Sequence, residues 1–295
     1  MDERGARRRA TLVGALAVLL WATLALLTDA TGRVPPFQLT AMTFGLAFAL
    51  ALARWLARGD DFRERLRLPA AAWAVGVGGL FGYHAVYFLA LRLAPAVEAS
   101  LIAYLWPLLI VVLSAALPGE RLLARHLAGA LLGLAGAALI VLKDGGAFRP
   151  EHLGGHAAAL ACAFIWSFYS LASRRLKAVS SEAVGACCGA TAALALAAHL
   201  GFEATVWPQG AGQWLAVAAL GLGPVGAAFF VWDHGVKHGD IQALGAFSYA
   251  APLLSTGLLI LAGAAEPSWG IGLACLLIAG GATMAASDLF ARRSD

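Results

Sequence analysis

The chain has 295 residues, of which 61% are hydrophobic and 13% are charged, and its formal net charge is +4. A soluble domain carries about 25% charged residues, so this composition excludes a water-facing globular fold and indicates a membrane protein. The positive charge does not indicate nucleic-acid binding, because the basic residues form short clusters between long apolar runs.

Ten mainly apolar stretches follow one another, and each is long enough to cross a bilayer as a helix of about 20 residues. Helices are favoured because lipid leaves every backbone polar group to be satisfied within the protein, and the short alternating segments of a β-barrel are missing. The predicted spans are 10–28, 37–57, 70–91, 95–117, 123–142, 154–173, 183–203, 211–236, 240–262 and 268–290. The first span follows a basic segment and is too long for a signal peptide.

The positions of lysine and arginine predict the orientation of the spans. Cytoplasmic loops are enriched in basic residues. With the N-terminus in the cytoplasm, 17 of the 21 basic residues fall on the cytoplasmic side, and the outer side keeps only Arg33, Arg92, Lys143 and Arg149. This bias predicts that both termini are cytoplasmic.

An internal repeat appears at an offset of 145 residues, which aligns Trp21 with Trp166 and the motif Tyr-x-x-Pro-Leu-Leu at 104–109 with its copy at 249–254. The predicted units are therefore 1–145 and 146–295, with five spans each. Because five is odd, the second unit enters the membrane from the opposite side. Such inverted-topology repeats are typical of secondary transporters, although a duplication with a purely structural role is the alternative.

Ten spans in two inverted halves, with a tryptophan in the first span and Tyr-x-x-Pro-Leu-Leu in the fourth span of each half, resemble the drug/metabolite transporter superfamily. The segments Pro118-Gly119-Glu120 and Ala264-Ala265-Glu266 are similar to the Gly-Glu pattern of its EamA-type exporters. The tyrosine-rich third and fourth spans most resemble the aromatic amino acid exporters of that superfamily. The resemblance implies a non-ATP carrier, although Ala250 and Ala251 replace the Leu105 and Trp106 of the first half.

Aromatic and polar residues in the middle of spans are the candidate substrate-binding residues. Buried phenols need hydrogen-bond partners, and an ionisable residue in a span is a functional candidate. A cavity or substrate, or else a neighbouring helix, supplies these partners. The candidates of this kind are Tyr83, His84, Tyr87, Tyr104, Tyr169, Ser248 and Tyr249, and Trp21, Trp106 and Trp166 would add flat apolar walls.

Pro107 and Pro252 interrupt the fourth and ninth predicted spans at equivalent positions. Proline has no backbone N–H, so each one leaves the carbonyl four residues earlier without its helical partner. These carbonyls, of Ala103 and Ser248, are candidate acceptors for a substrate ammonium group or a water. A kink that serves packing alone is the alternative.

Two acids near span ends, Glu98 and Asp233, are candidate gate or coupling groups, although solvation at the membrane interface also explains both. No nucleotide-binding loop or catalytic motif is present, so we expect neither an ATP-driven pump nor an enzyme, and no catalytic residue, metal or cofactor. A carrier for another class of metabolite or drug is the main alternative, and an ion channel or an intramembrane enzyme is less favoured.

The sequence therefore predicts an all-α, multi-pass protein of the inner membrane. We expect a carrier that exports amino acids, including aromatic ones, and related metabolites by alternating access. Its partners would be these small molecules and the lipid bilayer, with no nucleic acid, and it could act as a monomer.

Overall fold

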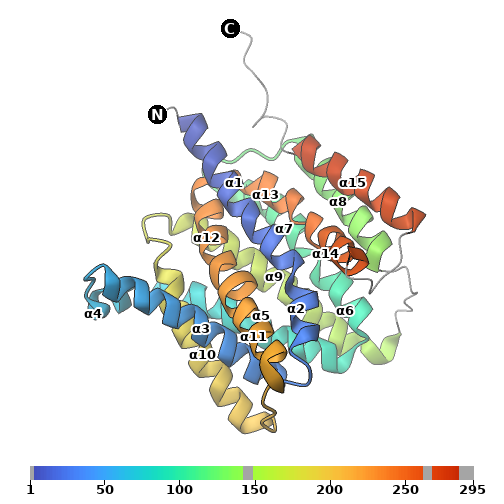
Figure 1. The fold of residues 1–295 in the computed structure, drawn as a ribbon. Coiled ribbons are helices and arrows are strands. Elements are labelled where there is room, and N and C mark those ends of the chain that lie inside the picture. The colour runs from blue at the N-terminus through green and yellow to red at the C-terminus, as the bar shows by residue number, and fades with distance from the viewer. Residues whose placement is uncertain (1–2, 142–148, 262–267, 286–295) are drawn as a thin grey trace.

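The structure is a computed structural model that describes residues 3–141, 149–261 and 268–285, so Glu266 lies outside the described residues. Within these ranges every regular element is a helix, as predicted (Figure 1). The α-helices are α1 (Glu3–Ala22), α2 (Leu24–Ala30), α3 (Pro36–Ala57), α4 (Phe62–Leu66), α5 (Ala70–Leu93), α6 (Ala96–Ala103), α7 (Trp106–Leu113), α8 (Ala124–Val141), α9 (Leu153–Arg175), α10 (Ala183–Phe202), α11 (Gly210–Leu222), α12 (Ala228–His238), α13 (Ile241–Phe247), α14 (Ala250–Leu261) and α15 (Trp269–Ala285).

Seven helical segments in the described ranges are long and apolar enough to cross a membrane. They coincide with the first four and with the sixth to eighth predicted spans, and two shorter apolar helices, Ala124–Leu139 and Trp269–Ala285, lie in the fifth and tenth. The ninth predicted span is divided into α13 and α14. The all-helical membrane protein predicted from the sequence is thereby confirmed.

Both prolines of the repeated motif lie just after a helix break. The fourth predicted span ends as α6 at Ala103 and resumes as α7 at Trp106, and the ninth breaks between α13 and α14. The hydroxyl of Tyr249 accepts the backbone N–H of Leu108 at 3.1 Å, which ties the second break to the first. The carbonyl of Ser248 accepts the N–H of Ala251 at 3.1 Å, so a local turn already uses this predicted acceptor.

The eighth predicted span carries a third irregularity. Between α11 and α12 the chain forms a π-helical turn, η3 (Gly223–Ala227), which contains Pro224. Such turns are frequent at functional sites. The indole N–H of Trp21 donates to the Pro224 carbonyl at 3.1 Å, so the first and eighth spans meet at this irregular backbone.

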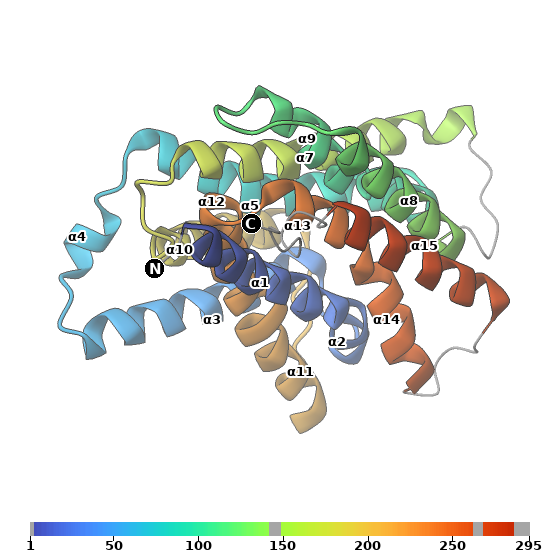
Figure 2. The same cartoon turned by 90° about the horizontal axis from the view of Figure 1, so that it is seen from above.

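The helices pack in pairs that join the two halves of the sequence: α3 lies against α10, α5 against α9, α1 against α12, and α8 against α15. The pair of α8 and α15 forms one end of the molecule, and α3 and α10 lie at the opposite end (Figures 1 and 2). If the helices of one half are replaced by their counterparts in the other, the same pairs result.

Small residues make the closest helix contacts. Gly14 of α1 meets Gly235 of α12, where an added Cβ would lie 2.8 Å from the Gly235 Cα. The 145-residue offset places Ala159 and Ala90 at the equivalent positions, and these two alanines are buried in one cluster between α9 and α5. Small residues allow this approach where lipid provides no hydrophobic drive between helices.

Candidate functional site

A cavity of about 450 Å³ lies between the two halves. Its walls come from α1, α2, α3, α5, α6, α7, α9, α11, η3, α12 and α14, so α3 contributes a wall that the sequence did not indicate. The cavity reaches the end of the bundle where α2 finishes and α3 begins, because Thr31, Gly32 and Val34 line it there.

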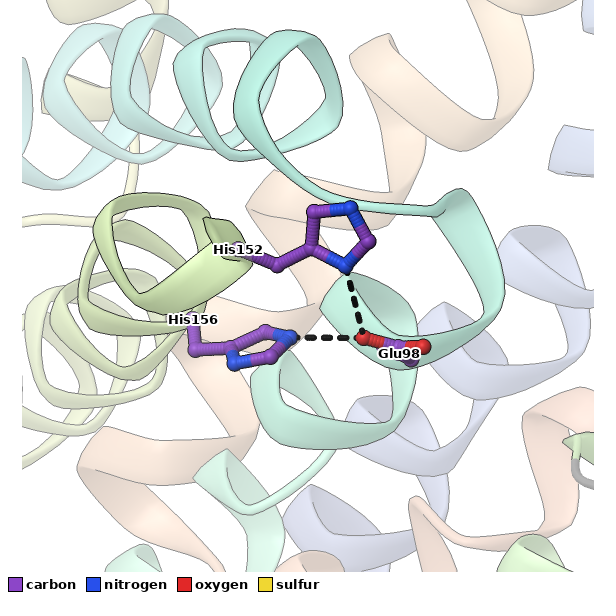
Figure 3. Close-up of side chains that lie close together, drawn as sticks. All are labelled: Glu98, His152 and His156. Carbon is purple, nitrogen blue, oxygen red and sulfur yellow. Dashed lines mark hydrogen bonds and ion pairs between the residues drawn. The ribbon is translucent and has the colours of Figure 1, made fainter. Parts of the chain in front are cut away.

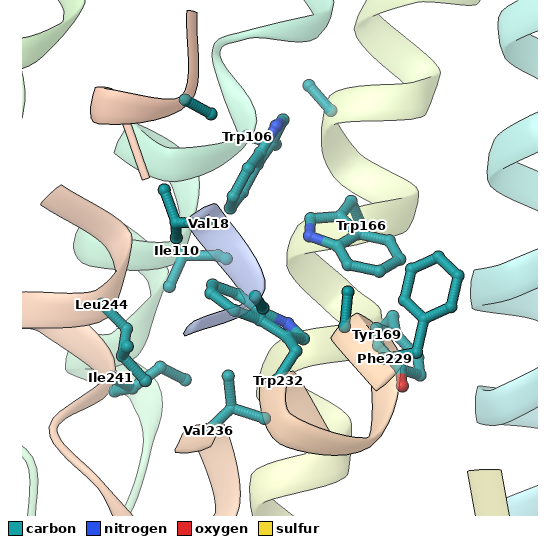
Figure 4. Close-up of a cluster of buried hydrophobic side chains, with 14 of the residues drawn as sticks. Val18, Trp106, Ile110, Trp166, Tyr169, Phe229, Trp232, Val236, Ile241 and Leu244 are labelled. Atoms are coloured by element: carbon teal, nitrogen blue, oxygen red, sulfur yellow. The ribbon is translucent and has the colours of Figure 1, made fainter. Parts of the chain in front are cut away.

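Four tryptophans close the opposite end of the cavity. Trp21, Trp106 and Trp166 line the cavity, and Trp232 lies fully buried behind them. The ring centroid of Trp21 lies 5.1 Å from that of Trp232, with the rings tilted, and 5.6 Å from that of Trp166, with the rings edge to face. Such pairs are favourable beyond the area they bury. Figure 4 shows three of these indoles together with Phe229.

An apolar layer packs next to the tryptophans, toward the N-terminal end of α1 and the C-terminal ends of α7 and α12. It consists of Val18, Ile110, Val236, Ile241 and Leu244, all buried (Figure 4). These side chains come from α1, α7, α12 and α13. These buried side chains close the cavity on the side of the N-terminal end of α1.

On the far side of the apolar layer, charged side chains connect α1 and α9 to Glu120 and Asp240. Arg7 of α1 contacts Asp240 at 3.0 Å and Glu120 at 3.3 Å, and Arg174 of α9 also contacts Glu120. Arg174 further donates to the carbonyls of Val236 at 2.8 Å and Gly239 at 2.9 Å. We call Arg7, Glu120, Arg174 and Asp240 the ionic cluster.

Polar side chains occupy one wall of the cavity. The Tyr87 hydroxyl is 2.9 Å from the Ser100 Oγ, and the ring of Tyr83 stacks on that of Tyr87 at 5.8 Å. The Nδ1 of His84 lies 2.7 Å from the Leu80 carbonyl, which can only accept, so Nδ1 carries a proton. His84 lines the cavity, and the Nε2 of its neutral ring is then a hydrogen-bond acceptor.

Seven of the predicted substrate-binding residues line this cavity. They are Trp21, Tyr83, His84, Tyr87, Tyr104, Trp106 and Trp166. No Asp, Glu, Lys or Arg is among the described residues that form its lining. The cavity therefore offers aromatic faces, hydroxyls and an imidazole, but no fixed charge.

The other five predicted residues, Pro107, Tyr169, Ser248, Tyr249 and Pro252, lie outside the lining. Tyr169 packs against Trp166 with ring centroids 4.9 Å apart, behind the tryptophan layer. The hydroxyl of Ser248 donates to the Leu244 carbonyl at 2.7 Å within α13. The structure thus places Ser248 and Tyr249 in helix contacts, the alternative that the sequence left open for buried polar groups.

The two predicted gate residues are also outside the cavity. The carboxylate of Asp233 lies 2.7 Å from the Lys237 ammonium, one helical turn further along α12. Both line a space of about 30 Å³, roughly the size of one water. Glu98, in the first turn of α6, contacts His156 of α9 at 2.7 Å.

Sequence reasoning missed several lining residues, chiefly Thr40, Thr43 and Phe44 of α3, Pro224 of η3 and Phe229 of α12. The phenyl rings of Phe44 and Phe229 stack at 5.5 Å. A phenylalanine in a span is equally compatible with a lipid-facing or a core position, so the residue type alone does not indicate a cavity wall. The Pro224 ring within a glycine-rich span was the one available indication.

Comparisons with known proteins agree with this architecture. The model of the EamA-like transporter family matches residues 8–142 and again 153–287. The aromatic amino acid exporter YddG of Ancylobacter novellus is 56% identical over 97% of this chain and 99% of its own length. The exporter of the same name from Escherichia coli is 24% identical over 94% of this chain and 97% of its own.

A solved crystal structure also matches the fold. It superposes with a TM-score of 0.91 at 55% sequence identity, and the match covers 97% of this chain and 100% of the other.

Proposed function

The chain belongs to the EamA-like transporter family and is a multi-pass transporter of the inner membrane, not an enzyme, and we propose that it exports aromatic and related amino acids by alternating access. The observation that carries this proposal is the 450 Å³ cavity, which is lined by aromatic rings and hydroxyls and closed at one end by four tryptophans. The cavity volume is within the range of small-molecule sites.

The proposed architecture is ten transmembrane helices in two inverted units, 1–145 and 146–295, with both termini in the cytoplasm. Three observations support it. The family model matches the chain twice, the 145-residue offset aligns the broken spans, and the helix pairs are unchanged when the two halves are exchanged. Inverted repeats permit alternating access because each unit can adopt the conformation of the other.

In this orientation the described conformation is open to the outside. The cavity reaches the end of the bundle where α2 meets α3, whereas the tryptophans, the apolar layer and the ionic cluster close the cytoplasmic end. Export would require these three layers to separate so that substrate enters from the cytoplasm. The outer ends of the helices would then close over the cavity.

The lining suits a zwitterion with an aromatic side chain. Trp106 and Trp166 offer faces and edges to an aromatic ring, and Tyr83, Tyr104 and the Nε2 of His84 offer hydrogen bonds to the polar end. The described residues of the lining include no Asp, Glu, Lys or Arg, so we expect broad specificity among apolar amino acids. A substrate of this kind loses part of its hydration and regains hydrogen bonds to neutral groups.

Flux measured in proteoliposomes tests this proposal. We expect saturable movement of phenylalanine, tyrosine and tryptophan without ATP, and a loss of about 10-fold or more with Trp106→Ala, because the aromatic contact disappears. Trp269→Ala is the matched control, since Trp269 is 96% exposed and is not among the residues that line the cavity. Poorly saturable ionic current, or wild-type flux in Trp106→Ala, would contradict the proposal.

A further inference from the structure

Three ligating side chains meet where α6 and α9 begin, outside the cavity. Glu98 extends from the first turn of α6, and His152 and His156 lie four residues apart at the start of α9. Figure 3 shows both imidazoles turned toward the same carboxylate. One ligand atom from each residue lies within 4.8 Å of the other two.

The separations are close to those that a metal ion requires. The Oε2 of Glu98 is 2.7 Å from the Nε2 of His156 and 3.6 Å from the Nδ1 of His152. Tetrahedral ligands about 2.1 Å from a zinc ion lie about 3.4 Å from one another. The two carboxylate–imidazole separations therefore differ from the tetrahedral value by less than about 1 Å, and a water could take the fourth position.

The Nδ1 of His152 is buried and has no hydrogen-bond partner among the described residues. It nevertheless points at the Glu98 carboxylate (Figure 3). The His152 side chain as a whole is 25% exposed, so an ion can reach the cluster from the surface. A buried ring nitrogen aimed at a carboxylate is the arrangement that a bound cation completes.

The negative charge of Glu98 also favours a bound cation at this cluster. Its side chain is 4% exposed, and its ion-pair partners within the described part of the chain are both histidines. At the cytoplasmic end, Arg7 supplies a permanent positive charge to Asp240. The 145-residue offset places His152 where Arg7 stands and Glu98 three residues after the position of Asp240, so an imidazole stands in the place of the fixed cation. A buried carboxylate without a compensating charge is costly.

We propose that Glu98, His152 and His156 form a binding site for a divalent transition metal ion, with zinc as its probe, that joins the outer ends of α6 and α9. Two imidazoles and one carboxylate are a ligand set that zinc accepts in proteins. The ion would hold α6, which carries Ser100 into the cavity wall, against α9. The proposal concerns binding and is independent of what the protein transports.

The test measures zinc binding to the purified full-length protein, in a Cys275→Ala background that removes the one exposed thiol of the described residues. Competition with a chromophoric chelator should show one zinc ion per chain. Replacing a hydrogen-bond partner of a metal ligand already weakens binding about 10- to 100-fold. We therefore expect His152→Ala, His156→Ala and Glu98→Gln each to weaken binding at least about 100-fold.

The control is the double variant His234→Ala/His238→Ala. These histidines are also four residues apart, with ring centroids at 5.0 Å, but they belong to the other end of the molecule. Zinc affinity unchanged in this variant, with X-ray absorption showing two nitrogen ligands and oxygen at about 2.0–2.2 Å, supports the site.

Thermal unfolding without zinc shows which variants are folded, and only these are compared. Equal zinc affinity in the wild type and in a folded Glu98→Gln or His156→Ala protein overturns the proposal. A loss of binding confined to His234→Ala/His238→Ala overturns it as well.

Discussion

Tyr104 and Tyr249 are equivalent in sequence but not in environment. Tyr104 lines the cavity, whereas Tyr249 is fully buried and its hydroxyl accepts the N–H of Leu108. Among the described hydrogen bonds, none joins Tyr104 to Leu253, which is the residue equivalent to Leu108. The same residue type thus lines the cavity in one half and makes a helix contact in the other.

Tyr249→Phe should lower stability by about 0.5–2 kcal/mol, because the buried N–H of Leu108 loses its acceptor. Thermal unfolding in detergent measures the effect. Tyr104→Phe is the matched control and should unfold within about 0.5 kcal/mol of the wild type, while its flux of amino acids changes. Equal stability of the two variants would show that the Leu108 contact contributes nothing.

Helix packing depends on individual glycines even within one turn. Gly79 of α5 faces Tyr169 of α9, where an added Cβ would lie 2.4 Å from the ring. A Cβ on the adjacent Gly78 meets nothing within 4 Å. The close approach of α5 to Tyr169 of α9 therefore requires a glycine at position 79 but not at position 78.

Gly79→Ala should destabilise the protein by about 1–3 kcal/mol, because Tyr169 or the helix backbone must move. Gly78→Ala should be neutral or slightly stabilising, since alanine is the better helix former. Denaturation of both purified variants compares the two effects. If Gly78→Ala is the more damaging substitution, the packing of α5 on α9 differs from the one described.

At the scale of the whole molecule, the two units carry different conformations of one motif. In the orientation that we propose, a cavity open to the outside and a closed cytoplasmic end would follow from this difference. If the units exchange conformations during transport, Tyr104 should accept the N–H of Leu253, and Tyr249 should enter a cavity open to the cytoplasm. A structure of the protein in that state, with the Tyr104 hydroxyl more than about 3.5 Å from the Leu253 nitrogen, would contradict the exchange.

Glu120→Gln should favour the cytoplasm-open conformation, because Arg7 and Arg174 both contact this carboxylate. If the conformation with a closed cytoplasmic end loses about 1.4 kcal/mol of stability relative to the cytoplasm-open one, the population of the cytoplasm-open conformation rises about 10-fold. Thiol labelling of a Val18→Cys reporter measures it, in a Cys275→Ala background, because Val18 is fully buried in the apolar layer.

The matched control for the ionic cluster is Glu151→Gln, which removes an exposed carboxylate at the other end of the bundle. Its labelling rate should equal that of the parent protein. A labelling rate that Glu120→Gln leaves unchanged would mean that the tryptophans and the apolar layer keep the cytoplasmic end closed without the ionic cluster.

The sequence by itself determined the membrane class, the helical spans and the breaks at Pro107 and Pro252, because apolar length and proline chemistry act locally. It also indicated the tyrosines of α5 and the tryptophan in the first span of each half, since rare aromatic residues within spans can be recognised from the sequence. Tertiary structure alone decided that Tyr104 faces the cavity and Tyr249 does not, because the two residues have the same local sequence signal. It likewise brought Phe44 to Phe229 and Glu98 to His156, because such pairings depend on which helices pack together and at what distance.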